Sequence, residues 1–170
     1  SNAGKAVVAT ISGTSVSFGT AVQFDANADY ISASFDSDTN KVILSYFLDA
    51  DTDSGQAVVG TVSGTAISFG TPVTFASASA ARISSAYDTS AKKTVVLYRD
   101  GTNSDLGKVV ELETSGTSLT ASSIQQFSAT TTSSTSSVYD PDNLKTVTSY
   151  VDEGNSSDLE TVLFTGTTIT

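Results

Sequence analysis

GQAVVGTVSGTAISFGTPVTF (residues 55–75) repeats, with few changes, the earlier stretch GKAVVATISGTSVSFGTAVQF (residues 4–24). The two stretches agree at 14 of 21 positions without a gap. A more diverged third copy starts at Gly107, and a fourth starts near Glu160. A repeat of this length is typical of architectures in which each unit buries its apolar face against its neighbour.

The copies divide the chain into three full repeats and one partial repeat, which we expect to form a single β-repeat domain over residues 4–170. The repeats cover about 4–54, 55–106, 107–159 and 160–170. Ser1-Asn2-Ala3 has the form of the scar that cleavage of a purification tag leaves. We therefore expect the natural sequence to begin at Gly4.

The composition favours a pleated structure and disfavours several kinds of partner. Apolar residues make up 38% of the chain, Ser and Thr are abundant, and β-branched residues are frequent, as in β-sheets. The net charge is −10 and no basic run occurs, so we expect no binding to nucleic acid or to an anionic membrane surface. Cys, His, Met and Trp are absent, which excludes disulfides, thiolate or imidazole metal ligands and an imidazole base.

The first half of each copy contains two β-strand patterns. The compact apolar run at 57–62, matched at 6–11, is typical of a strand that is buried on both faces. After a Ser-Gly-Thr turn, apolar residues alternate over 67–75, and Gly70 predicts a bulge or bend within that strand. In the third copy the Phe-Gly-Thr of the bend is replaced by residues 120–122, so we expect a different bend there.

The second half of each copy contains two more strand patterns, at 83–87 and 95–98 in the second copy. Between them lies a turn led by an aspartate, which we expect to accept hydrogen bonds from the backbone two residues on. These aspartates are Asp36, Asp88 and Asp140. The Ser/Thr run 130–137, which precedes the last of these turns, is expected to be mobile.

Four short strands per copy, with turns every 8–12 residues, match one blade of a β-propeller. We therefore predict an all-β fold of tandem four-stranded antiparallel repeats of the propeller-blade type, each copy folding as one equivalent sheet. A sandwich or other stacked β array is the alternative. Three copies and a hairpin are too few for a closed ring, and open strand edges invite association. We expect a homo-oligomer or a longer repeat array.

The loop after the fourth strand is acidic in every copy, which suggests Ca²⁺ as a cofactor. Oxygen ligands at alternate positions near a glycine are what a calcium loop requires. The candidate ligands are Asp49, Asp51, Asp53, Asp100, Asn103 and Asp105. The first loop resembles the Asp-rich loops of integrin-type propeller repeats, but Ser54 and Gly60 depart from the EF-hand pattern. A solvated turn explains the same residues, because Asp, Asn and Gly are ordinary turn formers.

The aromatic residues offer one candidate contact site. Tyr46, Tyr98 and Tyr150 recur at intervals of 52 residues, a pattern of strand packing more than of a sugar-stacking platform. Tyr30 occurs in a single copy, in a loop-like context, and is the better candidate for an exposed ligand contact. Two isolated arginines, Arg82 and Arg99, are expected to be surface charges.

We predict no enzymatic activity. The many hydroxyl groups have no histidine to activate them, and no lysine has the Ser-x-x-Lys spacing. Paired carboxylates could act on glycosides, but these acids recur in every repeat, whereas an active site normally needs one asymmetric group of residues.

GTVSGTAISFGTPVTF (residues 60–75) and its continuation AYDTSAKKTVVLYRD (residues 86–100) resemble a tandem repeat found in predicted virion and surface proteins of marine bacteriophages, including tail-fibre-like proteins. The resemblance covers nearly the whole chain and implies repeated display modules on a virion or cell surface, without catalytic residues. We expect a non-catalytic attachment module that binds a host glycan or protein. The alternatives are a purely structural spacer and, from the enzyme class, a glycan hydrolase.

Overall fold

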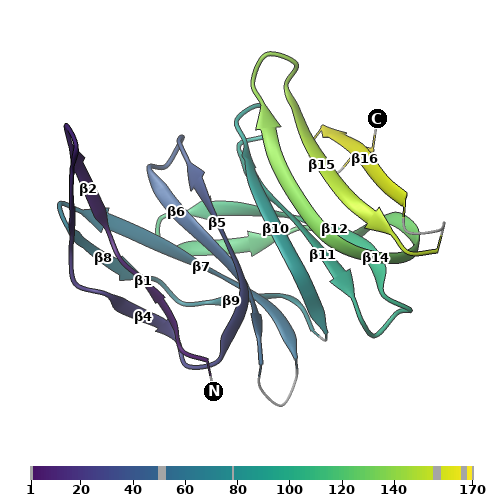
Figure 1. Ribbon diagram of the computed structural model, residues 1–170, viewed down its shortest axis with the longest axis horizontal. Coiled ribbons are helices and arrows are strands. Elements are labelled where there is room, and N and C mark those ends of the chain that lie inside the picture. Colours follow the sequence, from purple (N-terminus) through teal and green to yellow (C-terminus); the bar gives the residue numbers. More distant parts are fainter. Residues whose placement is uncertain (1, 50–52, 78, 155–157, 166–167, 170) are drawn as a thin grey trace.

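The computed structural model describes residues 2–49, 53–77, 79–154, 158–165 and 168–169 of the chain (Figure 1). These residues form strands and turns without a helix, and each strand pairing among them is antiparallel. The predicted all-β class is therefore confirmed. The described residues contain no helix long and apolar enough to cross a membrane.

The strands follow the alternating patterns of the sequence, and their bounds show how the copies correspond. In chain order they are β1 (Gly4–Ala6), β2 (Ala9–Ser12), β3 (Ser15–Phe18), β4 (Val22–Asp25), β5 (Ala28–Asp36), β6 (Lys41–Leu48), β7 (Ser54–Ser63), β8 (Ala66–Phe69), β9 (Val73–Ala76), β10 (Ala80–Asp88), β11 (Lys93–Asp100), β12 (Leu106–Ser115), β13 (Ser118–Ala121), β14 (Gln125–Asp140), β15 (Lys145–Asp152), β16 (Asp158–Thr165) and β17 (Thr168–Ile169).

The two large sheets take strands from successive copies, so the expectation of one sheet per copy is wrong. β5 and β6 of the first copy continue into β7, with β8 and β9 of the second copy on the far edge of β7. β10, β11 and β12 repeat this order, with β13 and the start of β14 on β12. The rest of β14 pairs with β15, followed by β16 and β17. At the N-terminus, β1 pairs with β4 and β2 with β3 as two separate two-stranded sheets of the first copy, which we together call the half-sheet.

The predicted bend divides the second strand of each copy into two short strands. The Gly70 amide donates to the carbonyl of Val59 at 2.9 Å, between β8 and β9. A Cβ at Gly70 would lie 2.0 Å from the carbonyl oxygen of Thr117, in the turn of the next sheet, so glycine permits the sheets to approach closely. In the third copy Ser122 makes the same bond to Glu111 at 2.9 Å, so the bend is retained there and the expectation of a different bend is wrong.

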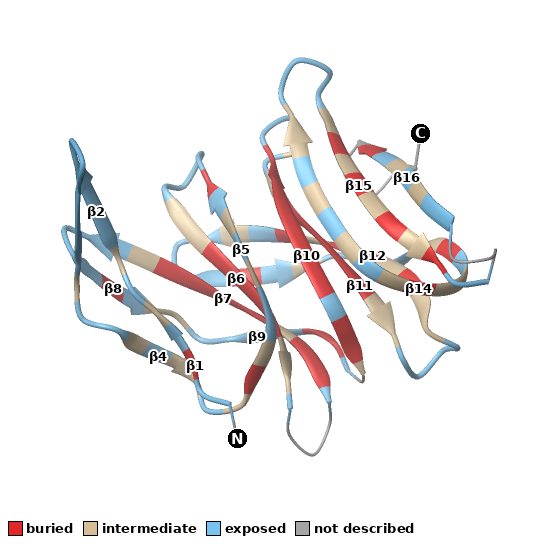
Figure 2. Cartoon of the chain, viewed as in Figure 1, coloured by how far each residue is buried: buried red, intermediate tan, exposed pale blue. Residues whose placement is uncertain are grey.

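The core lies between successive sheets, as the red bands of Figure 2 show. The sheet of β5–β9 and the sheet of β10–β13 enclose the largest apolar layer. It consists of Ile43, Ala57, Val59, Phe75, Ala76, Ala80, Ile83, Val96, Tyr98, Val110, Leu112 and Leu119. A second layer, around Tyr46 and Val58, joins the half-sheet to the sheet of β5–β9. A third, around Leu97 and Phe164, joins the last two sheets.

Burial on both faces is confirmed for the apolar run of the second copy and wrong for the first. Val58 packs into one apolar layer and Val59 into the next, and both are fully buried. In the half-sheet, Val7 is 46% and Ile11 is 73% exposed, because no described sheet covers its outer face.

The recurring tyrosines pack against a phenylalanine of the neighbouring sheet. Ring centroids lie 5.1 Å apart for Phe24 and Tyr46, 5.5 Å for Phe75 and Tyr98, and 5.1 Å for Phe127 and Tyr150. Under each phenylalanine lies a glycine whose Cβ would be 2.5 Å from the ring; these are Gly4, Gly55 and Gly107. The tyrosines are therefore packing residues and form no exposed platform.

Candidate functional site

A row of bulges marks the edge where the sheets lie closest. β5 and β10 are edge strands, β14 pairs with both β12 and β15, and β10 contacts both β5 and β14. Each has one register shift against its neighbour, and at each shift one residue has a positive φ: Tyr30 (45°), Arg82 (55°) and Ser134 (52°). None is glycine, and this conformation costs a side-chain-bearing residue about 1–3 kcal/mol. We call these three residues the bulge row.

Hydrogen bonds between sheets hold the bulge row in place. The hydroxyl oxygens of Ser32 and Ser85 lie 2.9 Å apart, and the Ser85 amide donates to the Ser32 hydroxyl at 2.9 Å. One sheet further, the Thr135 hydroxyl donates to the carbonyl of Arg82. Hydrogen bonds therefore link the strand segments that carry the three bulges.

Tyr30 and Arg82 form the chemically distinctive part of the row. The Arg82 guanidinium carbon lies 5.3 Å from the centroid of the Tyr30 ring, which is a cation–π contact. The Tyr30 ring also packs edge-on against Phe47, with centroids 6.1 Å apart. Tyr30 is 40% exposed and Arg82 is exposed, so both side chains are accessible to a ligand. An aromatic face beside a cation can stack on a sugar ring or pair with an anionic group.

The structure places the predicted contact residue Tyr30 in a strand and not in a loop, but leaves it exposed. Sequence reasoning missed its partner, because Arg82 was interpreted as an isolated surface charge. The spacing carries the missing signal, since 30, 82 and 134 are 52 residues apart and occupy the same place in three copies.

The first acidic loop is described only in part. Asp49 and Asp53 are described, and Asp51 lies outside the described residues. The Asp49 amide donates to the carbonyl of Asn27 at 2.8 Å, and the Asp53 carbonyl accepts from the Ala80 amide at 3.3 Å. Neither contact involves a carboxylate.

The second acidic loop lies wholly within the described part of the chain, and its own residues engage both of its carboxylates. Asp100 Oδ1 accepts from the Thr102 hydroxyl at 2.6 Å and from the Thr102 amide at 3.1 Å. Asp105 Oδ1 lies 3.3 Å from Nε of Arg99, so Arg99 is an ion-pair partner. The Asn103 amide donates to the carbonyl of Asp100 at 3.2 Å. These bonds are those of an ordinary turn.

The third acidic loop shows a similar arrangement at Asp152. This side chain is buried, and its Oδ1 accepts from the Thr130 hydroxyl at 2.6 Å and from the Gly154 amide at 2.9 Å. Within the described ranges, no three acidic side chains converge as metal ligands would. Calcium binding at these loops stays a prediction.

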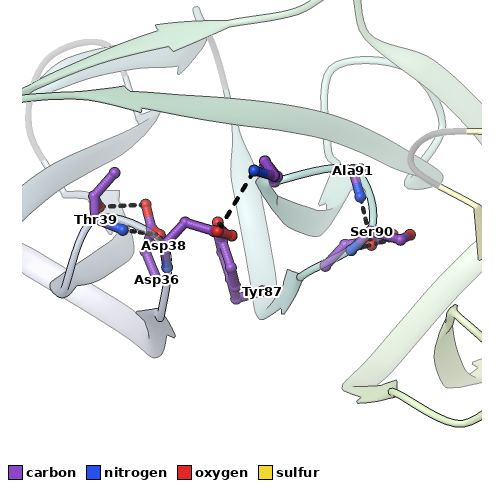
Figure 3. Close-up of polar contacts among 8 residues, drawn as sticks. Asp36, Asp38, Thr39, Tyr87, Ser90 and Ala91 are labelled. Carbon is purple, nitrogen blue, oxygen red and sulfur yellow. Dashed lines mark hydrogen bonds and ion pairs between the residues drawn. The ribbon is translucent and has the colours of Figure 1, made fainter.

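The aspartate-led turns make the predicted bonds to their own backbone. Asp36 Oδ1 accepts from the amides of Asp38 and Thr39, both at 3.0 Å (Figure 3). Asp88 accepts from the amides of Ser90 and Ala91 in the same way, at 2.9 Å.

The first of these turns also contacts the next sheet, as Figure 3 shows. The Tyr87 hydroxyl donates to Asp38 Oδ2 at 2.6 Å, and Lys92 Nζ lies 3.8 Å from Asp38 Oδ1. Burial and the bond to Asp38 both raise the pKa of Tyr87. The turn therefore fastens one sheet to the next.

Neither a protein-family model nor a curated protein nor a solved structure matches this chain. The function of the chain is therefore inferred from the geometry of the bulge row and of the sheets.

Proposed function

We propose that this chain is a non-catalytic attachment module of a virion or cell surface, in which the bulge row contacts a host glycan or protein. The observation that carries the proposal is the combination of one backbone conformation with three unlike side chains. Tyr30, Arg82 and Ser134 share a positive φ and a place in the sheet, yet they offer an aromatic ring, a cation and a hydroxyl group. A constant scaffold with varied exposed side chains is what a display surface requires.

The sheets of this module are blades of the propeller type. The hairpins β5–β6, β10–β11 and β14–β15 recur along the chain, and β10 contacts both β5 and β14, as the inner strands of successive blades do. The resemblance to phage virion repeats points to the same class of module.

Binding to a glycan array tests the proposal, with fluorescently labelled protein as the probe. We expect Tyr30→Ala to remove binding to the glycans that the parent chain recognises, because a stacked aromatic ring supplies much of the affinity for a sugar. Arg82→Ala is expected to weaken binding most for acidic glycans. Lys108→Ala is the matched control, because it removes a cation that bonds to Gln126 outside the bulge row.

A second candidate is a purely structural spacer, which the close packing of the sheets favours. The bend glycines Gly19 and Gly70 each leave no room for a Cβ against the turn of the next sheet. A chain that binds no glycan and no host-surface protein while its repeats assemble stably would support the spacer and overturn the attachment module.

A further inference from the structure

We propose that copies of this chain assemble head to tail by strand exchange, with the N-terminal half-sheet (β1–β4) of one copy docking beside β15 of a second copy. The half-sheet would take the place that β16 and β17 hold there. This inference rests on the blade arrangement proposed above and is independent of ligand binding by the bulge row.

The outer face of the half-sheet is the first observation. Three of its apolar side chains are exposed: Val7 46%, Val16 55% and Phe18 69%; Ile11 is exposed too, but so is its counterpart Val62 in the covered sheet. At the places of Val7 and Val16 in the next sheet lie Val58 and Ile67, which are 0% and 9% exposed. The preceding sheet covers those two residues, whereas no described sheet covers the half-sheet. A contiguous exposed apolar face of this kind marks an interaction surface.

The open face of β5 is the second observation. Ile31 is 47% and Phe35 is 55% exposed, whereas Ile83 and Tyr87, at the same places in β10, are 9% and 7% exposed. β5 itself covers β10. On its other side, β5 has no equivalent described strand to cover it as β5 covers β10.

The free edge of the half-sheet is the third observation. Among the described strands, β1 pairs only with β4 and β2 only with β3, whereas β7, their counterpart, also pairs with β6. The half-sheet therefore lacks an antiparallel neighbour equivalent to β6, and that neighbour would itself pair with a strand equivalent to β5. The hairpin of β14 and β15 has this form, because β15 pairs with β16 as β6 pairs with β7.

The C-terminal strands are the ones that the half-sheet can replace. Leu159 of β16 is 74% exposed at the place where β7 and β12 have the buried glycines Gly55 and Gly107. The half-sheet also contains Phe24 packed over Gly4. Beside β15, it would supply the same phenylalanine–glycine packing that the other sheets have.

One docking event covers both apolar surfaces. β14 of the second copy would lie on Ile31 and Phe35, and the outer face of the half-sheet would lie on the sheet of β10–β13 in that copy. The contact joins unlike surfaces, so it extends into chains or closes into rings. Exchange of an equivalent element between copies is a low-cost route to such assembly.

Sedimentation equilibrium tests the proposal, over about 10 μM to 1 mM chain, the range in which weak association is visible. The average mass is expected to rise with concentration for the parent chain, and Phe18→Asp is expected to remain monomeric. Ile124→Asp, which changes a side chain that is 46% exposed away from both surfaces, is expected to behave like the parent. A monomer at every concentration, or equal effects of the two variants, would overturn the proposal.

A gain of affinity identifies the docking geometry. Phe35 lies at the place of Tyr87, and Asp142 of the second copy lies at the place of Asp38 in the covering turn. Phe35→Tyr is therefore expected to tighten association about tenfold, by a hydrogen bond to a charged acceptor. Adding Asp142→Ala is expected to cancel that gain, and a gain that persists would contradict the assigned contact. Because glycan binding is measured separately, failure here leaves the attachment proposal standing.

Discussion

The Tyr87 hydroxyl donates a 2.6 Å hydrogen bond to the Asp38 carboxylate in the turn of the preceding sheet. The corresponding bond is absent one sheet further within the described part of the chain. There Ser90 takes the place of Asp38 and donates its hydroxyl to Asp88, and the buried hydroxyl of Tyr139 has no partner. Tyr87 and Tyr139 therefore occupy the same place in successive sheets, but among the described residues only the Tyr87 hydroxyl has a hydrogen-bond partner.

This difference predicts unequal costs for the same substitution. Tyr87→Phe is expected to lower the free energy of unfolding by about 1–2 kcal/mol, because it removes a bond to a charged group. Tyr139→Phe removes a buried hydroxyl without a described partner, so its cost is expected to be below about 0.5 kcal/mol. Urea unfolding measures both, and equal costs would contradict the assigned contact.

Adding a single methyl group at Gly70 is expected to lower the stability of the fold strongly. Gly70→Ala places a Cβ 2.0 Å from the carbonyl oxygen of Thr117, and the forced separation of two sheets is expected to cost about 1–3 kcal/mol. Ser122→Ala is the control, because Ser122 already carries a Cβ at the same bend. Its expected cost is smaller, about that of one exposed hydrogen bond. Thermal unfolding compares the two variants, and similar melting temperatures would count against this packing.

Asp36 predicts acid sensitivity. Burial is the largest single influence and raises its pKa, but several hydrogen bonds, chiefly those from the Thr39 hydroxyl and amide, together hold the pKa below its ordinary value of 3.8. A carboxylate with a lowered folded-state pKa stabilises the fold fully above about pH 5 and loses that contribution as the pH falls through the folded-state pKa. Asp36→Asn should therefore flatten the stability profile below pH 4. A profile as steep as that of the parent would contradict the assignment.

The contacts of the second acidic loop favour the solvated-turn alternative over calcium binding at that loop. Thr102 and Arg99 already engage its two carboxylates. Melting temperatures in chelator and in millimolar Ca²⁺ are expected to agree within about 1 °C. A ligand at 100 times its Kd adds about 2.7 kcal/mol, so a rise of several degrees would show a bound ion. If such a rise occurred and Asp100→Asn removed it, the site would lie in this loop.

Much of the fold was predictable, because apolar alternation, turn glycines and turn aspartates are local signals. The bend at Gly70 and the turn bonds of Asp36 and Asp88 follow from them, and both are confirmed. The sheet boundaries were not predictable, because periodicity within a copy does not state which copy supplies the neighbouring strand.

The bulge row was not predicted, for a related reason. Tyr30 and Arg82 have positive φ values although neither is glycine, so the residue type does not signal this conformation. The contact between their side chains depends on how two sheets stack. The Ser/Thr run 130–137, expected to be mobile, forms part of β14, since its backbone pairs with β15 on both sides of the bulge. Polar composition alone does not show such pairing.

The stacking of β5 against β10 underlies the bulge row and the order of the sheets, and it brings the Ser32 and Ser85 hydroxyl oxygens within 2.9 Å. Because the chain contains no cysteine, the double variant Ser32→Cys/Ser85→Cys has a single thiol pair. Mass spectrometry after mild oxidation is expected to show an intramolecular disulfide, whereas the control Ser32→Cys/Ser137→Cys, with its thiols two sheets apart, stays reduced. Free thiols in the first pair, or equal oxidation of both pairs, would contradict the stacked arrangement.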